Sequence, residues 1–458
     1  MATAEKRSPD PQEEEEEEEE EEAAAPPPAP LEAPQLCSEL LLAAGRGGAG
    51  PRPIEENLPR AIRQRELGGC RWGCFSLGDR LRLSSHFLPN AVTFATSYPH
   101  KAFCGLFAPD GSIFVSAAQD QYLRFYSPSP HGFRFLRSSR ARSVAWSILD
   151  VAFTPDSSQC LYSSWADAIH VFDVHGEGET HTALELSPPE RRFAVFSLAV
   201  GPGGCEVLGG GSDGCVYGYD RGAQRRVLRF PAHDDDVNAV ALGSASGRLL
   251  LSGGDDGICR AWDLREPPGR AAAQLGGHRD GVTALHPRGD DRYVVSNSKD
   301  QTAKLWDLRQ PTGPRGVEAA RRAAARQNWD YRWQRAPREA LTSRPLPGDT
   351  SLMTYRGHSV LHTLVRCRLS PPEGSAGGHW LATGCASGCV IIYDVMSGRV
   401  LRRLANHGAC VRDVSWHPTN GSLASASWDG SVRLWGYRGE EEEEEEGAGP
   451  PAGPLPPP

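Results

Sequence analysis

The chain has 458 residues, among them 50 glycines and 37 prolines. With valine and aromatic residues in short runs, this composition favours many short strands joined by tight turns and predicts an all-β fold. The formal net charge of −9 comes from two uninterrupted glutamate runs, residues 13–22 and 440–446. Because like charges repel one another and bury nothing, these runs predict disordered acidic tails over residues 1–58 and 439–458.

The start of the chain lacks the apolar core of a signal peptide, and no stretch approaches the roughly 20 apolar residues that span a bilayer. We therefore expect an intracellular protein, nuclear or cytoplasmic or both, with no membrane partner and with reduced cysteines. Cys70 and Cys74, like Cys385 and Cys389, lack the partner pairs of a zinc site, so no metal or cofactor is expected. No basic stripe with interleaved aromatic residues indicates direct nucleic-acid binding.

From Lys101 onward a unit recurs that has three apolar stretches separated by turns. An aspartate in the second turn and an aromatic residue at the end of the third stretch set the register. Five copies space these two residues six positions apart: Asp120 and Tyr126, Asp213 and Tyr219, Asp256 and Trp262, Asp300 and Trp306, and Asp429 and Trp435. In two further copies Asp167 precedes Phe172 by five residues, and Ser387 replaces the aspartate before Tyr393. The sequence thus predicts seven copies over residues 101–438.

The copies are close to 44 residues apart except for a gap of 87 between Asp300 and Ser387. The alanine- and arginine-rich part of the gap favours a helix, and a proline-containing loop follows it. The gap contains a Trp-Asp dipeptide at Trp329, but no pair of strands precedes it. We interpret residues 310–356 as an insertion between the fifth and sixth copies, with a helix near residues 316–335, rather than as an eighth copy.

Several copies carry a histidine before the first stretch, as in Gly277-His278 and Gly357-His358. Together with the Trp-Asp endings, these residues resemble the WD40-repeat family, whose small antiparallel sheets stack radially into a β-propeller. The resemblance implies a seven-bladed propeller with a hydrogen-bonded set in several blades. The implied sets are His233, Ser252, Asp256 and Trp262; His278, Ser296, Asp300 and Trp306; and His407, Ser425, Asp429 and Trp435. A buried carboxylate needs such donors, so we interpret the sets as structural rather than as hydrolase triads.

The end of the last copy predicts how the ring closes. After Trp435 the chain runs into glutamates, which supply no outer strand for that copy. We therefore expect the N-terminal segment, residues 59–100, to close the propeller, with residues 79–87, "DRLRLSSHF", as the outer strand.

The word WDLR occurs in two neighbouring copies and places Arg265 and Arg309 two residues after Asp263 and Asp307. The repeat explains the Trp-Asp pairs but does not require the arginines. This pattern resembles the WDxR box of propellers that serve as substrate receptors of cullin 4 RING ubiquitin ligases. The resemblance implies that these four residues bind the damage-specific DNA-binding protein adaptor and, through it, cullin 4 and a RING subunit. Arginine suits such a role because its rigid fork of donors is enriched at interface hot spots.

Further stretches resemble one member of this receptor group over about residues 75–418, among them "AWSILDVAFTPD", "SNSKDQTAKLWDLR" and "QNWDYRWQ". Residues 23–57 depart from the longer acidic and leucine-rich region of that member. Residues 59–67, "PRAIRQREL", are a candidate for a short adaptor-binding helix.

The resemblance implies a non-catalytic subunit that docks on the adaptor by one rim and presents a target protein at its other face for ubiquitination. We expect target-binding positions where the first strands begin, at Leu149, Asn238, Thr283, Val365 and Arg412. Two alternatives stay open: a general WD40 scaffold for chromatin or signalling proteins, and a propeller hydrolase. A hydrolase would need a nucleophile beside a base in a pocket outside the blade networks.

Overall fold

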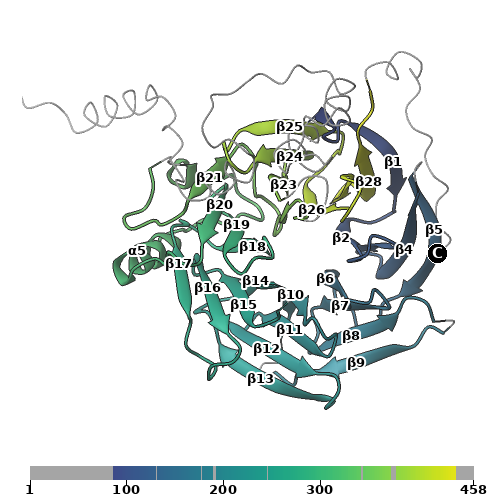
Figure 1. The fold of residues 1–458 in the computed structure, drawn as a ribbon, viewed down its shortest axis with the longest axis horizontal. Helices are drawn as coiled ribbons and strands as arrows, with labels where there is room; N and C mark the ends of the chain where they lie inside the picture. The colour runs from purple at the N-terminus through teal and green to yellow at the C-terminus, as the bar shows by residue number, and fades with distance from the viewer. Residues whose placement is uncertain are drawn as a thin grey trace, which may run out of the picture. The chain divides into compact units, whose positions relative to one another are not determined.

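The computed structural model describes residues 86–439, apart from 130–131, 177, 189–191, 245, 342–343 and 373–377. All described residues belong to one compact unit. They form seven four-stranded antiparallel sheets arranged around a central axis (Figure 1). The prediction of an all-β, seven-bladed propeller is therefore confirmed.

In the first six blades the strand nearest the axis comes first in the chain and the outermost strand comes last, whereas the outermost strand of the seventh blade is β1. The first three blades are β2 (Ala102–Phe107), β3 (Phe114–Ala118), β4 (Tyr122–Ser129) and β5 (Gly132–Arg140); β6 (Ile148–Phe153), β7 (Gln159–Ser164), β8 (Ala168–Asp173) and β9 (His181–Glu185); and β10 (Val195–Val200), β11 (Glu206–Gly211), β12 (Cys215–Asp220) and β13 (Arg225–Pro231). The next three are β14 (Val237–Leu242), β15 (Leu249–Gly254), β16 (Ile258–Asp263) and β17 (Ala273–Gly276); β18 (Val282–Pro287), β19 (Tyr293–Ser298), β20 (Thr302–Asp307) and β21 (Met353–Arg356); and β22 (Cys367–Leu369), β23 (Trp380–Gly384), β24 (Cys389–Asp394) and β25 (Val400–Ala405). The seventh is β26 (Val411–Trp416), β27 (Leu423–Ser427), β28 (Ser431–Gly436) and β1 (Ala91–Ser97).

Packing between blades explains the apolar runs of the inner strands. In β15, LLLSGG, every residue after Leu249 is buried, whereas the outer strand β25, VLRRLA, buries only Leu404. A strand covered on both faces needs no polar alternation. Glycine ends several second strands because the next blade comes close there: a Cβ on Gly210 would lie 2.7 Å from the carbonyl oxygen of Val237, and one on Gly384 would collide with that of Val411.

The N-terminal part of the described chain closes the ring, but with different residues from those predicted. The outer strand of the seventh blade is β1, in which Val92 pairs with Trp435 and Ser97 with Ser431. Of the predicted strand, residues 79–85 lie outside the described residues, and His86 and Phe87 belong to no strand. The prediction of this strand was therefore wrong by about ten residues.

The insertion also differs from its prediction, because it interrupts a blade rather than separating two blades. It follows β20, and its last residues form β21, the outer strand of the same fifth blade. Its helix α5 spans Pro314–Ala325 and is followed by a short 3-10 turn, η2 (Arg338–Leu341). The predicted helix near residues 316–335 was thus ten residues too long at its C-terminal end. None of the described helices is long and apolar enough to cross a membrane.

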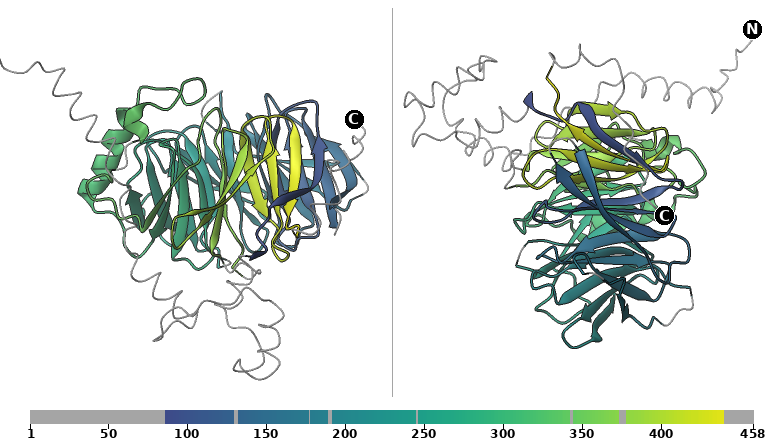
Figure 2. Two further views of the ribbon diagram at one scale, coloured as in Figure 1. Left: turned by 90° about the horizontal axis from the view of Figure 1, so that it is seen from above. Right: turned by 90° about the vertical axis from the view of Figure 1, so that its right-hand side faces the viewer.

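Small residues seat α5 against the outer side of the fourth blade (Figure 2). A Cβ on Gly276, at the end of β17, would lie 3.1 Å from the Cα of Val317 and 3.3 Å from the Cβ of Ala320. Pro314 occupies the first turn, where a missing N–H costs nothing. The helix therefore carries the chain along the flank of the fourth blade.

Strand register defines two rims of the propeller. In the fourth blade Asp263, at the end of β16, pairs with Leu249 at the start of β15. Val237, at the start of β14, pairs with Gly254 at the far end of β15. The loops that follow β16 and β20 therefore share one rim, which we call the WDLR rim after residues 262–265 and 306–309. The segments entering the first strands and the turns between second and third strands lie on the opposite rim.

Candidate functional site

The two WDLR words form the same local structure in neighbouring blades. The backbone N–H of Arg265 donates to Oδ1 of Asp263 at 3.0 Å, and Nε and Nη2 of Arg265 reach the same carboxylate at 2.9 and 2.6 Å. Arg309 repeats these bonds to Asp307 at 3.0, 3.2 and 3.0 Å. Both arginine side chains stay accessible, with 65% of Arg265 and 53% of Arg309 exposed. Each aspartate thus fixes the direction of an exposed guanidinium on the WDLR rim.

The two clamps differ in the surroundings of their aspartates. Hydrogen bonds from Arg265 hold the pKa of Asp263 at about 2, so this carboxylate is ionised at physiological pH. Asp307 is almost fully buried and also accepts a hydrogen bond from Nε of Arg292 at 3.4 Å. A guanidinium held in place in this way loses less rotamer freedom when a partner binds.

Sequence reasoning missed a third clamp, which lies in the insertion. In the word WDYR, Arg332 bonds to Asp330 through its backbone N–H at 2.9 Å, Nε at 2.9 Å and Nη2 at 2.8 Å. The Asp-x-Arg letters were visible in the sequence, but no repeat register pointed to them. The clamp is therefore a property of the local Asp-x-Arg turn and does not itself require a propeller blade.

The WDYR word lies on the opposite rim from the two WDLR words. Nε1 of Trp329 donates to Oδ2 of Asp280 at 2.9 Å, and Asp280 lies in the segment that enters β18. The backbone N–H of His362 donates to the carbonyl of Tyr331 at 2.8 Å, in the segment that leads to β22. Only Arg265 and Arg309, of these three arginines, share the WDLR rim.

The three predicted blade networks show a common hydrogen-bond pattern. In the fourth blade His233 contacts Asp256 at 2.9 Å and Ser252 at 2.7 Å, and Nε1 of Trp262 donates to Ser252 at 2.8 Å. In the fifth blade the corresponding distances among His278, Asp300, Ser296 and Trp306 are 2.9, 2.6 and 2.8 Å. In the seventh blade those among His407, Asp429, Ser425 and Trp435 are 3.3, 2.7 and 2.8 Å. All twelve side chains are engaged inside their blades, which gives them a structural role.

Buried histidines make the stability of the ring depend on pH. Burial lowers the pKa of His286 to about 3 and that of His358 to about 4. His358 lies 2.9 Å from the hydroxyl of Tyr393 and 2.8 Å from Oδ1 of Asn297. Below about pH 6.5 these histidines become protonated in the unfolded chain but stay neutral in the folded chain. The free energy of unfolding therefore decreases as the pH falls from about 6.5 towards 4.

We expect the melting temperature to fall steadily between about pH 6.5 and about pH 4.5, because each buried histidine costs at most about 1.4 kcal/mol per pH unit. Thermal melts followed by tryptophan fluorescence would measure this dependence. His358→Gln should flatten it, and a melting temperature that stays constant over this range would contradict the assignment.

The five residues predicted to bind a target do not form an exposed surface. Leu149, Asn238, Thr283, Val365 and Arg412 are all buried. Their polar groups bond to other blades: Asn238 donates to the carbonyl of Val282 at 3.0 Å and Thr283 to that of Val365 at 3.0 Å, each in the next blade. Arg412 donates to the carbonyl of Leu149, two blades further round the ring, at 2.8 Å. The prediction placed them correctly where first strands begin, but that position faces the next blade and the channel rather than solvent.

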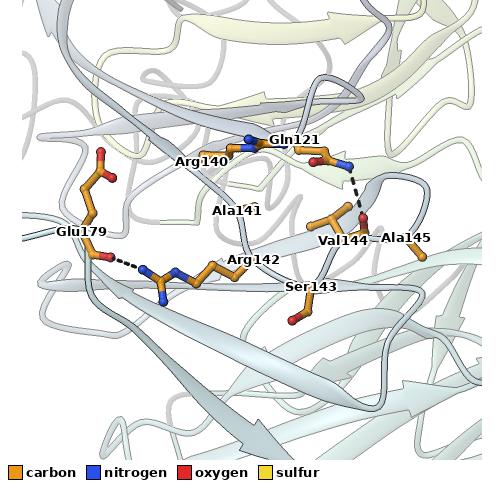
Figure 3. A pocket seen from close by; sticks show the side chains of 8 residues that line it. All are labelled: Gln121, Arg140, Ala141, Arg142, Ser143, Val144, Ala145 and Glu179. Carbon is orange, nitrogen blue, oxygen red and sulfur yellow. Dashed lines mark hydrogen bonds between the residues drawn. The ribbon is translucent and has the colours of Figure 1, made fainter.

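The described part of the propeller contains two cavities that bear on function. One of about 320 Å³ lies in the central channel, lined by first-strand residues that include Asp150, Asn238, Thr283 and Arg366. The other, of about 630 Å³, lies beside the loop that links the first two blades (Figure 3). There Gln121 donates to the carbonyl of Val144 at 3.2 Å and Arg142 to that of Glu179 at 3.4 Å. The eight residues that line this second cavity offer Ser143 no imidazole to act as a base, so it lacks the arrangement a hydrolase needs.

In the described part of the chain, no three His, Cys, Asp or Glu side chains are grouped so that they could hold a metal ion. Nine free cysteines are described, and eight of them are buried. The eight buried cysteines are therefore core residues.

The fold and its blade networks define a WD40-repeat propeller. The model of the WD domain, G-beta repeat, matches residues 224–263, 269–307 and 398–436, which contain the residues that complete the three blade networks. A DDB1- and CUL4-associated factor 11 homolog from Caenorhabditis elegans is 36% identical over 428 residues, 89% of this chain and 73% of the relative. A LEC14B homolog from Prunus armeniaca is 37% identical over 383 residues, 81% of this chain and 79% of that protein. The chain belongs to the family that these two proteins represent.

A second DDB1- and CUL4-associated factor 11 homolog, from Caenorhabditis briggsae, is 33% identical over 413 residues, 84% of this chain and 72% of the relative. Each of these three matches covers at least 81% of this chain, so the similarity extends well beyond the three repeats matched above.

Proposed function

We propose that the chain is the substrate-recognition subunit of a cullin 4 RING ubiquitin ligase. The names of its Caenorhabditis relatives support an association with DDB1 and cullin 4. In this proposal the chain is a non-catalytic receptor. It binds the DDB1 adaptor on one side and a target protein on the other, and proximity to the ligase raises the effective concentration of the target lysines.

The observation that carries the proposal is the pair of exposed, pre-oriented guanidiniums on the WDLR rim. Arg265 and Arg309 follow the third strands of adjacent blades and have the same clamp geometry. Two rigid donors at a fixed spacing suit a surface of the adaptor that presents carboxylates or carbonyls. Asp263 and Asp307 act by holding these donors in place.

We expect the double variant Arg265→Ala/Arg309→Ala to bind purified DDB1 at least about tenfold more weakly than the wild type, since hot-spot arginines each contribute more than about 1 kcal/mol. Surface plasmon resonance with the full chain immobilised measures the change. Melting temperatures should be unaltered, because both side chains are exposed.

Arg332→Ala is the matched control for this experiment. It removes an arginine with the same clamp and similar exposure, 61%, from the opposite rim. Adaptor binding should survive this change. Undiminished binding by the double variant would remove the arginine assignment, and failure of the wild type to bind DDB1 would favour a general WD40 scaffold.

A further inference from the structure

The helix α5 of the insertion is followed by a loop rich in arginine and aromatic residues. This WDYR loop, residues 326–336, reads RQNWDYRWQRA and carries three arginines against one aspartate, in a chain whose net charge is −9. Trp333 is 84% exposed, more than any other large apolar side chain among the described residues. Arg326 and Arg335 are exposed as well. An aromatic side chain so open to water, with arginines around it, has the composition of a protein-binding hot spot.

The WDYR loop is fastened to the propeller by the residues that precede Trp333. Besides the Trp329–Asp280 and Tyr331–His362 hydrogen bonds, Nζ of Lys299 lies 4.4 Å from the centre of the Tyr331 ring. Within the loop the backbone N–H groups of Trp333 and Gln334 donate to the carbonyl of Asp330 at 3.0 and 2.8 Å. The Asp330–Arg332 clamp closes the same turn. The backbone that carries Trp333 is therefore held in place, which reduces the entropy lost when a partner binds.

The opposite rim gathers the other exposed tryptophans of the described chain. Trp146 lies in the segment that enters β6, and Trp165 follows β7, so both belong to this rim. They are 48% and 41% exposed. Trp428, in the corresponding turn of the seventh blade, has Nζ of the exposed Lys101 3.9 Å from its ring centre. Aromatic side chains and cations therefore accumulate on the rim that faces away from Arg265 and Arg309.

We infer that the WDYR loop is a target-binding element that takes an acidic peptide segment, packing an apolar side chain of that segment on Trp333 and its carboxylates against Arg326 and Arg335. This inference rests on the proposed function, because it assigns the target to the rim opposite the adaptor. Charge complementarity selects the partner: the loop carries three arginines, and its one carboxylate, Asp330, is already paired with Arg332 at 2.8 Å. In this arrangement Arg332 is a positioning residue that shapes the turn.

Selection from a displayed library of random peptides tests the inference with the full-length chain. Peptides retained by the wild type and rejected by Trp333→Ala should be rich in Asp and Glu and contain an apolar residue. A labelled peptide of this consensus should bind Trp333→Ala and Arg326→Ala/Arg335→Ala at least about tenfold more weakly in fluorescence anisotropy. Arg322→Ala removes an exposed arginine of α5 and should bind like the wild type.

Three outcomes would overturn the inference. The first is a consensus that is basic or uncharged, and the second is equal binding by Trp333→Ala. The third is peptide binding that appears only after residues 1–58 are removed, since the loop would then hold the chain's own glutamate run. The proposed function is tested separately, because Trp333→Ala should keep its DDB1 affinity and Arg265→Ala/Arg309→Ala should keep its peptide affinity.

Discussion

Replacing Val92 with aspartate is expected to open the ring and to leave little folded protein at room temperature. Val92 is buried opposite Trp435, in a cluster that includes Trp416 and Leu404. A carboxylate there finds no hydrogen-bond donor in the apolar cluster, and the change costs about 4 kcal/mol or more. That loss is comparable with the whole stability of a typical domain, about 5–15 kcal/mol.

The effect should exceed that of an ordinary core substitution because, among the described strands, β1 alone pairs with the outer edge of β28. Besides the strand pairing, Asn90 holds the segment that follows β28, accepting from the N–H of Arg438 at 2.8 Å and donating to its carbonyl at 2.8 Å. When β1 detaches, the seventh blade exposes an unpaired edge, which promotes aggregation. Circular dichroism and the soluble fraction after expression measure this outcome.

Two controls separate ring closure from general damage. Ser97→Asp places the same charge at the exposed end of β1. Its free energy of unfolding should lie within about 0.5 kcal/mol of that of the wild type. Removal of residues 1–58 keeps β1 and should leave the fold intact, whereas removal of residues 1–98 should not. A melting curve of Val92→Asp that matches the wild type would show that the ring does not depend on β1.

The blades could be predicted from the sequence because their signals are local. An aspartate turn and an aromatic residue six positions later recur at a near-constant interval, and hydrogen bonds within one blade connect them. The first blade shows where this reasoning stops. There the hydroxyl of Tyr98 contacts Ser116 at 2.6 Å and Tyr126 at 2.8 Å, so tyrosines take the places that histidine and tryptophan occupy elsewhere. Residue letters alone did not identify this set.

Pairing between distant segments was harder to predict. The sequence of β1, AVTFATS, has strand-forming residues between Pro89 and Pro99, yet residues 79–87 also read as a strand. Only the pairing with β28, some 340 residues later, distinguishes the two. The outer strand of the fifth blade was missed for a similar reason, since the insertion separates the four residues of β21 from β20.

The central channel contains a network of ion pairs that no local sequence pattern predicts. Nη1 of Arg366 lies 2.6 Å from Asp150 and 3.7 Å from Asp413, although Asp150 is 216 positions away in the chain. Asp150 also accepts from the N–H of Leu198 at 2.7 Å, and Asp413 from that of Gly105 at 3.1 Å. The network therefore joins the first, second, third, sixth and seventh blades. Four of the seven junctions between neighbouring blades lie within this arc.

Arg366→Met should destabilise the chain by about 3–5 kcal/mol, because it leaves the buried carboxylates of Asp150 and Asp413 without their cation. Burial alone would lower the pKa of Arg366, but Asp150 and Asp413 more than offset this and raise it, so the guanidinium remains charged. Methionine keeps much of the volume of the side chain, which limits the contribution of a cavity. Urea denaturation followed by tryptophan fluorescence gives the change in the free energy of unfolding.

A double variant tests why loss of Arg366 is expected to destabilise the chain. It separates the loss of the ion pair itself from the cost of leaving Asp150 buried without a partner. Arg366→Met/Asp150→Asn should be less destabilised than the two single variants added together, because the double variant no longer buries an unpaired Asp150. Arg322→Met breaks an exposed ion pair with Glu318 and should change stability by at most about 1 kcal/mol. If Arg366→Met were equally mild, water in the 320 Å³ channel cavity, which Asp150 lines, would have to replace the cation, and the ring would not depend on this network.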